Sequence, residues 1–478
     1  MRDRENKIFI PLLFFVFNVV LRYISIGLNS LAGDEPFSVY FAQMDILDIL
    51  RHLKPGNNPP LYELLLHYWI KIFGISEIAV RIPSLLFVGV TAAYIYKIGS
   101  AFFSRSTGVI AASVFSLSNY ATYFAHEARV YAMFGALSAI SFYLYLRWLN
   151  KDTSTVLLVT NTLVNALLLY AHYFGIMIVG VQGLLAIVFS FKDSKHLIRY
   201  GLSTAGVFLF FLPYIPIVVT QFTATQESGT WLQSPQGWST VEYMLLKFVN
   251  ARFVMLFTYF VFTTSLVSLI KNRSKITKNH AVIIAWFVVP FFGMFVLSYW
   301  LPMFHDRYLM HAFVGFCMLL SIAVTSLVSL PIIKWIVPTL LIVAMSIASR
   351  RNIDNGRHTQ DAVAKVQEIR TPETRVVLYP NYRILGYGYY FDRDKFESYD
   401  AAHAYNDVIE SFRQENLYAI NKFANAGIDS TINKIIFMMV DGGPKEQLLE
   451  QFGQEFKLKN THLFSDIIEI FELERSKS

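Results

Sequence analysis

Five groups of polar residues stand beside long apolar stretches of this sequence, and the first of them is a pair of carboxylates. Asp34 and Glu35 follow the first apolar stretch, within the segment Leu31 to Phe37. A carboxylate at such a place can act as a general base that removes a proton from a hydroxyl group. The alternative is a helix N-cap, because Asp caps helices well and Pro36 suits a first turn. A cap accounts for Asp34 but not for the adjacent Glu35.

The second group is the turn His126-Glu127-Ala128-Arg129, which joins two apolar stretches. A carboxylate, a guanidinium and an imidazole in one short turn are costly so close to hydrocarbon, and ionisable groups at that depth usually mark a functional site. The alternative is a solvated turn in which Glu127 and Arg129 pair with each other. We treat the turn as a candidate part of a site.

The remaining groups are His172-Tyr173, where two apolar stretches meet with almost no loop, the run His305 to Tyr308, and Arg22. His172 can equally be a hydrogen-bonded residue at the membrane interface. Arg307 can extend toward lipid headgroups or bind a phosphate through two parallel hydrogen bonds. Arg22 lies about one turn before the end of the first apolar stretch, and we expect it to extend outward, toward Asp34.

Together these carboxylates, arginines and imidazoles suit a phosphate-bearing substrate that is bound to a membrane. Arginines would hold an anionic leaving group while a carboxylate activates an incoming hydroxyl group. A transporter would instead place its polar residues near the bilayer midplane, on broken and internally repeated helices, and the sequence has neither. The sequence contains no HExxH motif and no Cys/His cluster, so it leaves the question of a metal open.

The apolar stretches that position these groups have the length of membrane spans. The 478 residues are 54% hydrophobic and only 16% charged, against roughly a quarter charged in soluble domains. A helix of about 20 apolar residues crosses the hydrocarbon core. The first stretch exceeds the core of a signal peptide, so we expect a retained anchor. Eleven spans are predicted, at 8–28, 82–103, 108–124, 130–148, 154–172, 174–191, 200–220, 252–270, 281–300, 309–330 and 334–348.

The orientation of these spans depends on segment 60–74. Its Glu63, His67 and Lys71 recur every four residues and share one helical face, so we expect a helix that lies along the membrane surface. With the N-terminus inside, Lys and Arg then concentrate in the cytoplasmic loops, as membrane proteins require. The net charge of +7 follows from this bias and needs no nucleic-acid partner. The loop 29–81 and the tail 350–478 are expected outside.

The tail resembles a separate soluble domain in its composition. Residues 375–379 and 434–440 are strand-like, the second run ends in a turn at 441–444, and 403–426 is helix-like. We therefore predict two domains, a membrane domain at 1–349 and a separable α/β domain at 350–478 that tunes access of the acceptor or the carrier. Cys317 lies alone within an apolar stretch, where we expect a packed thiol.

The motifs that contain these residues resemble those of the GT-C membrane glycosyltransferases related to protein O-mannosyltransferases and bacterial aminoarabinose transferases. The likeness is strongest over 20–150, and each motif is short, but their order and spacing are specific. The motifs are Leu21-Arg22, Gly33-Asp34-Glu35, Asn58-Pro59-Pro60-Leu61-Tyr62, Phe73-Gly74, Arg81-Ile82-Pro83-Ser84 and His126 to Ala132, followed by Tyr170 to Phe174 and Arg307-Tyr308-Leu309.

The resemblance implies a polytopic helical membrane protein of the GT-C type, with about 11 transmembrane helices and a small soluble α/β domain. It implies transfer of one sugar from a polyprenyl-phosphate carrier to a lipid, glycan or protein acceptor, by inverting displacement. The implied location is a bacterial or archaeal cell (inner) membrane, with the active site and the tail extracytoplasmic. Some relatives bind a divalent metal, which leaves the cofactor open. A flippase or carrier-binding protein without catalysis is the alternative.

The resemblance also implies roles for individual residues. Asp34 matches the acidic residue of the first external loop, the presumed base, with Glu35 beside it, and Glu127 matches a second acidic position. The family often has His or Tyr where Asn58 stands, so the chain departs from the pattern there. The expected contacts to the donor phosphate are Arg129, Arg307, Tyr308 and Arg22, and the expected contacts to the rest of the substrates are Asn58, His126, His172, Tyr173 and Tyr131.

The predicted topology can be tested with single cysteines. Ser234→Cys and Asp361→Cys should react with an impermeant thiol reagent in intact cells, because both positions are expected outside, and Ser274→Cys should not. The parent chain, whose single cysteine is Cys317, controls for background labelling. Labelling at Ser274 together with silence at Asp361 would overturn the eleven-span arrangement.

Overall fold

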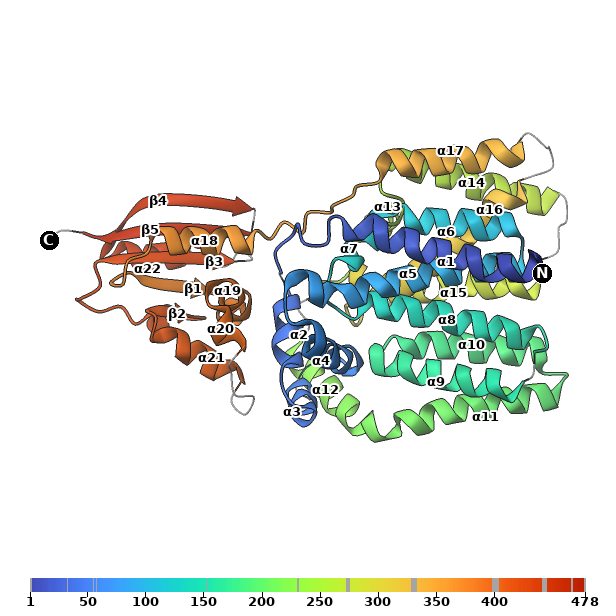
Figure 1. The fold of residues 1–478 in the computed structure, drawn as a ribbon, viewed down its shortest axis with the longest axis horizontal. Coiled ribbons are helices and arrows are strands. Elements are labelled where there is room, and N and C mark those ends of the chain that lie inside the picture. Colours follow the sequence, from blue (N-terminus) through green and yellow to red (C-terminus); the bar gives the residue numbers. More distant parts are fainter. Residues whose placement is uncertain are drawn as a thin grey trace. The chain divides into compact units, whose positions relative to one another are not determined.

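The computed structural model of the protein divides into two compact units, which are described separately (Figure 1). The predicted boundary at 349 and 350 lies near the start of the last segment of unit 2, but two parts of the loop 29–81 fall into that same unit. Unit 1 consists of Met1–Ile26, Arg51–Tyr62 and Arg81–Ile353, and unit 2 of Gly27–Leu50, Glu63–Val80 and Asp354–Ser478. The structure describes residues 2–31, 33–54, 56, 58–152, 154–229, 232–271, 276–327, 333–397, 404–440, 445–465 and 467–476.

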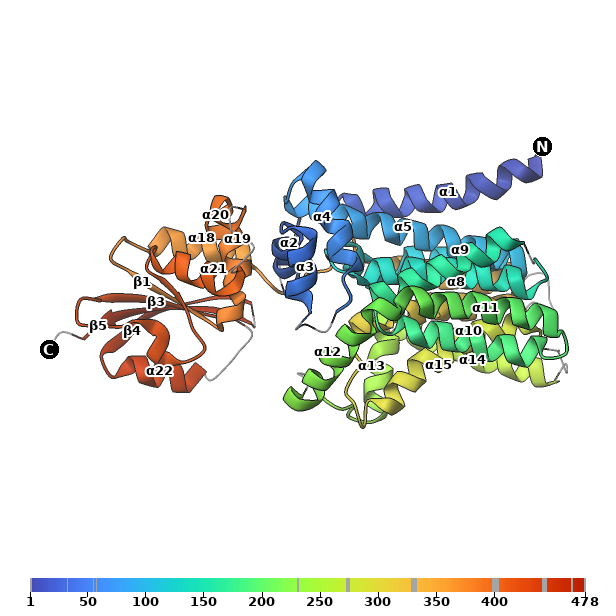
Figure 2. The same ribbon diagram turned by 90° about the horizontal axis from the view of Figure 1, so that it is seen from below.

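Unit 1 is built from helices, most of which lie side by side (Figure 2). They are α1 (Arg2–Tyr23), most of α5 (Glu77–Phe102), α6 (Arg105–Ser116), α7 (Asn119–Ala125), α8 (Tyr131–Leu149), α9 (Thr155–Ala171), α10 (Gly175–Ser190), α11 (Ser194–Phe211), α12 (Ile215–Ser228), α13 (Trp238–Val249), α14 (Arg252–Lys271), α15 (Lys278–Leu297), α16 (Met310–Ser326) and α17 (Ile333–Ala348), with short 3-10 turns at Leu212–Tyr214 (η1) and Asp306–Leu309 (η2).

Within the described residues, six helices are long and apolar enough to cross a membrane, and four shorter apolar helices accompany them. These ten segments fall on ten of the eleven predicted spans. The six are Glu77–Phe102, Tyr131–Leu149, Ser194–Glu227, Arg252–Lys271, Lys278–Leu297 and Asp306–Ser326, and the four are Ile8–Tyr23, Thr155–Ala171, Gly175–Ser190 and Trp335–Ala348. The predicted cytoplasmic loop 271–280 includes 272–275, which lie outside the described residues.

The eleventh predicted span, 108–124, is not one helix. It is divided between α6 and α7, because the chain leaves the helical conformation at Ser118, whose side chain accepts a hydrogen bond from the Tyr120 amide and caps α7. Hydrophobicity alone does not reveal this break, since the capping serine is small and buried among apolar neighbours. The consequence is that α7 ends at Ala125, directly before the His126 turn.

Buried polar side chains connect four neighbouring helices of unit 1. Ser141 of α8 donates to the Asn165 side chain of α9 at 2.5 Å, and Asn165 donates to Gln182 of α10 at 3.1 Å. Gln182 returns a hydrogen bond to Ser141 at 2.7 Å and accepts one from the Tyr200 hydroxyl of α11 at 3.0 Å. Hydrogen bonds of this kind compensate polar groups that lipid cannot satisfy.

Unit 2 contains α2 (Glu35–Ala42), most of α3 (Ile46–Leu53) and most of α4 (Leu61–Phe73). The helix predicted at 60–74 is confirmed as α4, but its polar face is not the solvated one. Glu63 and His67 are buried, because α2 supplies partners for both of them. Ser38 donates to Glu63 at 2.9 Å, and His67 Nδ1 lies 2.9 Å from the carbonyl oxygen of Ala42.

The rest of unit 2 is an α/β fold around a five-stranded sheet with the strand order β2-β1-β3-β5-β4. Strands β1, β2 and β3 are parallel, and β4 and β5 are antiparallel to their neighbours. The strands are β1 (Arg375–Tyr379), β2 (Leu417–Ala419), β3 (Lys434–Val440), β4 (Phe456–Ser465) and β5 (Ile468–Arg475), and the other elements are α18 (Thr359–Ile369), η3 (Asn381–Arg383), α19 (Ile384–Phe391), α20 (Arg393–Glu397), α21 (Ala404–Arg413), η4 (Phe423–Ala426) and α22 (Lys445–Gly453).

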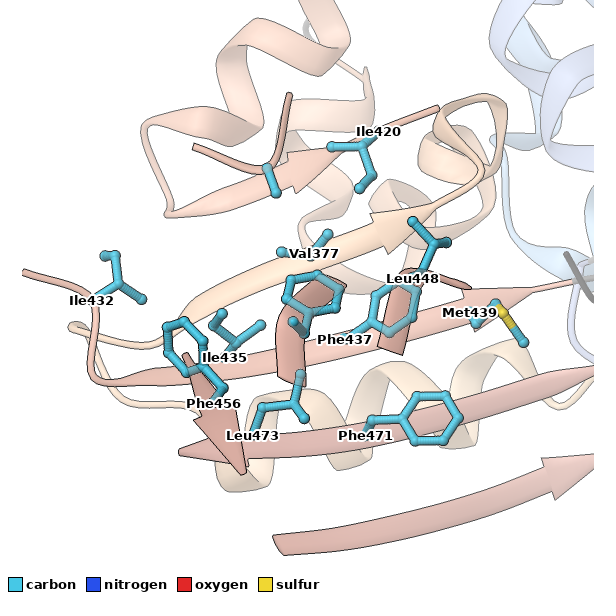
Figure 3. Packing of buried hydrophobic residues seen from close by; sticks show 12 residues of the cluster. Val377, Ile420, Ile432, Ile435, Phe437, Met439, Leu448, Phe456, Phe471 and Leu473 are labelled. Atoms are coloured by element: carbon cyan, nitrogen blue, oxygen red, sulfur yellow. The ribbon is translucent and has the colours of Figure 1, made fainter. Parts of the chain in front are cut away.

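The apolar core of this fold lies between the sheet and α22. Val377 of β1, Phe437 of β3 and Phe471 of β5 pack from the sheet against Leu448 and Phe452 of α22 (Figure 3). Helices α18 and α19 lie on the opposite face of the sheet (Figure 2). Helix α19 also packs on α2 through aromatic side chains, and the ring of Tyr40 lies 5.6 Å from that of Phe396 beyond α19.

Both strands predicted in the tail are confirmed, as β1 and β3, whereas the turn predicted at 441–444 lies outside the described residues. The helix predicted at 403–426 is wrong beyond Arg413. The chain turns at Asn416, which has a positive φ of 58°, and Leu417–Ala419 then pairs with β1. Cys317 is free and buried in α16, as predicted.

Candidate active site

The acidic loop of unit 2 places Asp34 directly before α2. Asp34 is half-buried, and its backbone carbonyl accepts the first helical hydrogen bond, from the Ser38 amide at 3.1 Å. Its side chain makes no capping hydrogen bond to the helix, so the cap alternative does not describe what the carboxylate does. Glu35 is buried in the first turn of α2, 2% exposed. The loop therefore carries one half-buried and one buried carboxylate.

The second candidate group, the turn 126–129 of unit 1, is held inside the protein. His126 and Arg129 are buried and Glu127 is half-buried, which excludes the solvated turn that sequence alone allowed. His126 Nε2 donates to the carbonyl oxygen of Arg22 at 2.9 Å. Ser84 Oγ donates to the carbonyl oxygen of Arg129 at 3.3 Å and shares a hydrogen bond of 3.1 Å with the Tyr62 hydroxyl.

These contacts connect motifs that are far apart in the sequence. The Asn-Pro-Pro-Leu-Tyr segment contributes Tyr62, the Arg-Ile-Pro-Ser segment contributes Ser84, and both support Arg129 from α5 and the start of α4. The same Arg-Ile-Pro-Ser segment binds the end of α1, because Arg81 donates to the carbonyl oxygen of Ile26 at 2.9 Å. The motifs thus form one hydrogen-bonded support for the turn.

Arg22 does not extend outward as the sequence suggested. Its side chain is fully buried, and its guanidinium donates to Asn18 at 2.5 Å and to the Ser116 carbonyl oxygen at 2.9 Å. The reason is that α1 packs against α6, whose last residue offers an unused carbonyl group. Together with the contact from His126 to its backbone, this makes Arg22 a brace beneath the turn 126–129.

A third group forms where the 3-10 turn η2 meets the start of α8 and the junction of α9 and α10. Arg307 donates to the Tyr131 hydroxyl at 3.4 Å, and its guanidinium lies 5.9 Å from the centre of that ring. The Tyr308 ring packs 5.3 Å from His172 and 5.4 Å from Phe174. The structure therefore brings together four predicted site residues, Tyr131, His172, Arg307 and Tyr308.

His172 and Tyr173 are neighbours in the sequence but belong to different surroundings. His172 joins the group around Tyr308, whereas the Tyr173 hydroxyl donates to Gln221. Gln221 in turn donates to the carbonyl oxygen of Leu53 at 2.9 Å. Asn58 is half-buried in the segment before α4.

The sequence missed several polar residues of this region. Lys247 of α13 forms an ion pair with Asp306, which also lies 2.7 Å from His305 Nδ1. Burial lowers the pKa of Lys247, but the Asp306 carboxylate outweighs it and raises the pKa above its usual value. His311, buried in α16, lies 4.9 Å from the Phe134 ring that also packs on His172. Only the amphipathic pattern of 238–249 could have indicated that Lys247 faces inward.

No group of three or more His, Cys, Asp or Glu side chains within the described residues is placed to hold a metal ion. The electrostatic character of the region comes instead from arginines, tyrosines and carboxylates. Guanidinium groups bind phosphate oxygens through two parallel hydrogen bonds and remain charged near an apolar surface. An arrangement of this kind at the ends of apolar helices suits an anionic headgroup with a long apolar tail.

Comparisons with known proteins agree with this arrangement. Residues 57–219, about a third of the chain, match the family model described as dolichyl-phosphate-mannose-protein mannosyltransferase. The structure is similar to ArnT from Cupriavidus metallidurans in the apo state, with a TM-score of 0.60 and 10% identity, covering 96% of this chain and 97% of that chain. ArnT bound to undecaprenyl phosphate gives a TM-score of 0.59 with the same identity and coverage.

An oligosaccharyltransferase from Archaeoglobus fulgidus, in complex with zinc and sulfate, gives a TM-score of 0.52 at 12% identity, over 89% of this chain and 67% of that chain. A search of the curated proteins found no match. The fold of the chain is that of the GT-C membrane proteins, as the resemblance in the sequence predicted. The family match confirms the resemblance itself and the class, a membrane glycosyltransferase.

The position of Arg22 generates a prediction. Arg22→Ala should lower the thermal stability of the purified protein, since losing the partner of buried polar groups costs about 1–3 kcal/mol for each group left unsatisfied. Arg22→Lys should recover part of the loss, because a single ammonium cannot reproduce both contacts. Melting temperature in detergent is the measurement, with the exposed Arg105→Ala as the control. An unchanged melting temperature with weaker donor binding would make Arg22 a ligand of the donor instead.

Proposed function

We propose that this protein is an integral membrane enzyme that transfers a single sugar from a polyprenyl-phosphate-linked donor to an acceptor hydroxyl group. The observation that carries the proposal is the group of Arg307, Tyr131, Tyr308 and His172 close to the ends of apolar helices, together with the buried Arg129. The fold shared with ArnT, one structure of which contains undecaprenyl phosphate, supports the choice of the carrier. The acceptor is a lipid, a glycan or a protein.

The donor phosphate is the group that the arginines recognise. Arg129 is 4% exposed, so its charge is little screened by water and attracts an anion more strongly than a surface arginine does. Arg307 adds a second guanidinium, and the Tyr131 hydroxyl that it contacts is a further hydrogen-bond donor for a phosphate oxygen. In this proposal Arg129 and Arg307 bind the phosphate, and Tyr308 and His172 line the space for the sugar.

The reaction is a direct displacement at the anomeric carbon. Asp34 accepts the proton of the acceptor hydroxyl, and the acceptor oxygen forms the new glycosidic bond while the bond between the anomeric carbon and the phosphate oxygen breaks. The leaving group is the polyprenyl phosphate, whose added negative charge the arginines stabilise. The configuration at the anomeric carbon inverts. Glu35 and Glu127 are the other carboxylates that can take the part of the base.

The cellular setting belongs to the proposal as well. The apolar helices and the GT-C fold make the chain an integral membrane protein. We propose that it lies in a bacterial or archaeal cell membrane, with the acidic loop and the C-terminal residues on the extracytoplasmic side. The Lys and Arg bias of the predicted cytoplasmic loops supports this orientation.

The role of Asp34 can be tested in the full chain reconstituted in lipid. Asp34→Asn should lower kcat by about 10²–10⁴-fold with little change in donor affinity, because a general base acts in the transition state. The wild-type protein is first given a panel of polyprenyl-phosphate sugars and acceptors, and products are identified by mass spectrometry. Asp45→Asn is the matched control, since Asp45 is an exposed carboxylate of the same loop.

A normal transfer rate in a folded, donor-binding Asp34→Asn protein would remove Asp34 from the mechanism and leave Glu35 or Glu127 as the base. A wild-type protein that binds donors and yields no product with any of them would favour the alternative function, a carrier-binding protein or flippase. Loss of binding on removal of the arginines, with tolerance of Asp34→Asn, would support the same alternative.

The arginines should behave differently from the carboxylate. Arg129→Ala and Arg307→Ala should weaken binding of undecaprenyl phosphate and also lower kcat, because a phosphate contact exists in both the ground state and the transition state. Arg129→Lys should restore binding only in part, since an ammonium group lacks the geometry of the guanidinium fork. Titration calorimetry measures the affinity, and melting temperature separates loss of a contact from loss of folding. Unchanged affinity in both alanine variants would contradict the assignment.

A further inference from the structure

Residues of the C-terminal part of unit 2 bind the acidic loop through backbone atoms. The Ser30 carbonyl oxygen accepts from Asn355 at 3.1 Å, and the Ser30 hydroxyl accepts from the Gln360 amide at 3.2 Å. The Leu31 amide donates to the Tyr390 hydroxyl at 2.5 Å. These contacts join positions more than 300 residues apart, and they fix the course of the chain immediately before Asp34.

Gly33, the residue before Asp34, is held by two arginines. Its carbonyl oxygen accepts from Arg383 at 3.2 Å. Its φ of +61° is a left-handed conformation that favours glycine, and a Cβ atom built on it would collide with the guanidinium of Arg357. The absence of a side chain therefore allows Arg357 to lie against the backbone at the position adjacent to the carboxylate.

The charges of this group fit together. Arg383 is largely buried, and burial lowers the pKa of its guanidinium, as does the neighbouring Arg357, while the Asp34 carboxylate raises it. Two guanidinium groups side by side repel each other unless an anion lies close to both. The Asp34 carboxylate is an anion within range of Arg383, so the loop and the two arginines form one electrostatic group.

The same C-terminal residues also hold the second segment of unit 2. The Tyr389 hydroxyl donates to the carbonyl oxygen of Ile75 at 2.8 Å, and the Tyr390 hydroxyl donates to Glu77. Gln43, just after α2, contacts the carbonyl oxygen of Phe396 at 3.5 Å. Helix α2 and its preceding loop are thus connected to the C-terminal residues at both ends, which leaves Asp34 little freedom to move.

We propose that Arg357 and Arg383 are positioning residues for the Asp34 carboxylate, so that the C-terminal residues take part in the transfer step. The inference rests on the proposed function of Asp34 as the base. It differs from the role expected from the sequence, in which the tail only tunes access of the acceptor or the carrier. The arginines act through Asp34: they set the backbone of the turn and supply the positive charge beside its carboxylate.

The expected kinetic signature is a change in kcat. A displacement of about 1 Å at a reacting group can cost about 10²-fold in rate, so Arg383→Gln should lower kcat by up to about that factor. Affinity for undecaprenyl phosphate should stay within about twofold, because the proposed phosphate ligands are Arg129 and Arg307. Arg383→Lys keeps a charge and one donor and should recover part of the rate. Arg413→Ala is the matched control, an arginine of the same unit paired with Glu410.

The decisive measurement is a double-mutant cycle in the full chain, with the donor and acceptor found by the mass-spectrometry panel. If Arg383 acts through Asp34, then Arg383→Gln should change the rate of the Asp34→Asn protein by less than about twofold. A loss in the Asp34→Asn protein equal to that in the wild type would overturn the inference. A weaker affinity for undecaprenyl phosphate with unchanged kcat would overturn it too, because Arg383 would then contact the donor.

Hydrogen exchange gives a second measurement, which needs no substrate. Arg383→Gln and Gly33→Ala should each speed exchange at the amides of residues 33–38, and unchanged exchange in both would contradict the positioning role. Failure of the proposed function is distinguishable from failure of this inference. In the first case Asp34→Asn alone keeps the normal rate, whereas in the second Asp34→Asn is impaired and Arg383→Gln leaves kcat unaltered.

Discussion

A polar group placed among membrane-spanning helices must find its partner within the protein, because hydrocarbon offers none. Arg22 is the clearest example in this chain, since its guanidinium is satisfied by Asn18 of its own helix and by a carbonyl group at the end of α6. That contact requires α1 and α6 to lie side by side at one height. It also leaves the Arg22 carbonyl oxygen as the acceptor for His126, so the position of the turn 126–129 depends on where α1 ends.

The same constraint explains why the motifs of the sequence occur in a fixed order. Tyr62, Ser84 and Arg129 belong to three motifs, and each is short and unspecific alone. In the fold they form one chain of hydrogen bonds, in which each hydroxyl group is satisfied by the next motif along. A substitution in any one of them leaves a buried polar atom of another without its partner, which costs about 1–3 kcal/mol. The motifs are therefore supports for the turn as much as sites of chemistry.

Much of the fold could be predicted from the sequence, because hydrophobic length and strand-like runs are local signals. Ten spans, the helix α4 and the strands β1 and β3 were predicted from them. The division of 108–124 was missed because it depends on one capping serine, and β2 was read as helix because its pairing with β1 is a long-range contact. Strands β4 and β5 were not predicted at all, although Ile468, Ile470 and Glu469 alternate in apolar and polar character.

For the candidate site, the sequence predicted the residue types but not their neighbours. It named Tyr131, His172, Arg307 and Tyr308 separately, and it did not predict that they meet. It predicted an exposed Arg22 and overlooked Lys247, because burial of a charged residue depends on a partner that is distant in the chain. Arg357 and Arg383 were missed for the same reason, since about 320 and 350 residues separate them from Gly33.

The acidic loop presents a physical problem that the helices cannot solve. A base that removes a proton from a polar acceptor must lie where the acceptor can reach it, and therefore on a loop, but fixing each loop residue costs about 1–2 kcal/mol of conformational entropy. Packing against lipid cannot supply that energy to a polar segment. Hydrogen bonds from a folded polar unit can, and the contacts of Asn355, Arg383 and Tyr390 with residues 30–33 are of that kind. On this argument the sheet of unit 2 matters to catalysis as the rigid base of these three side chains, although no strand residue touches the loop through them.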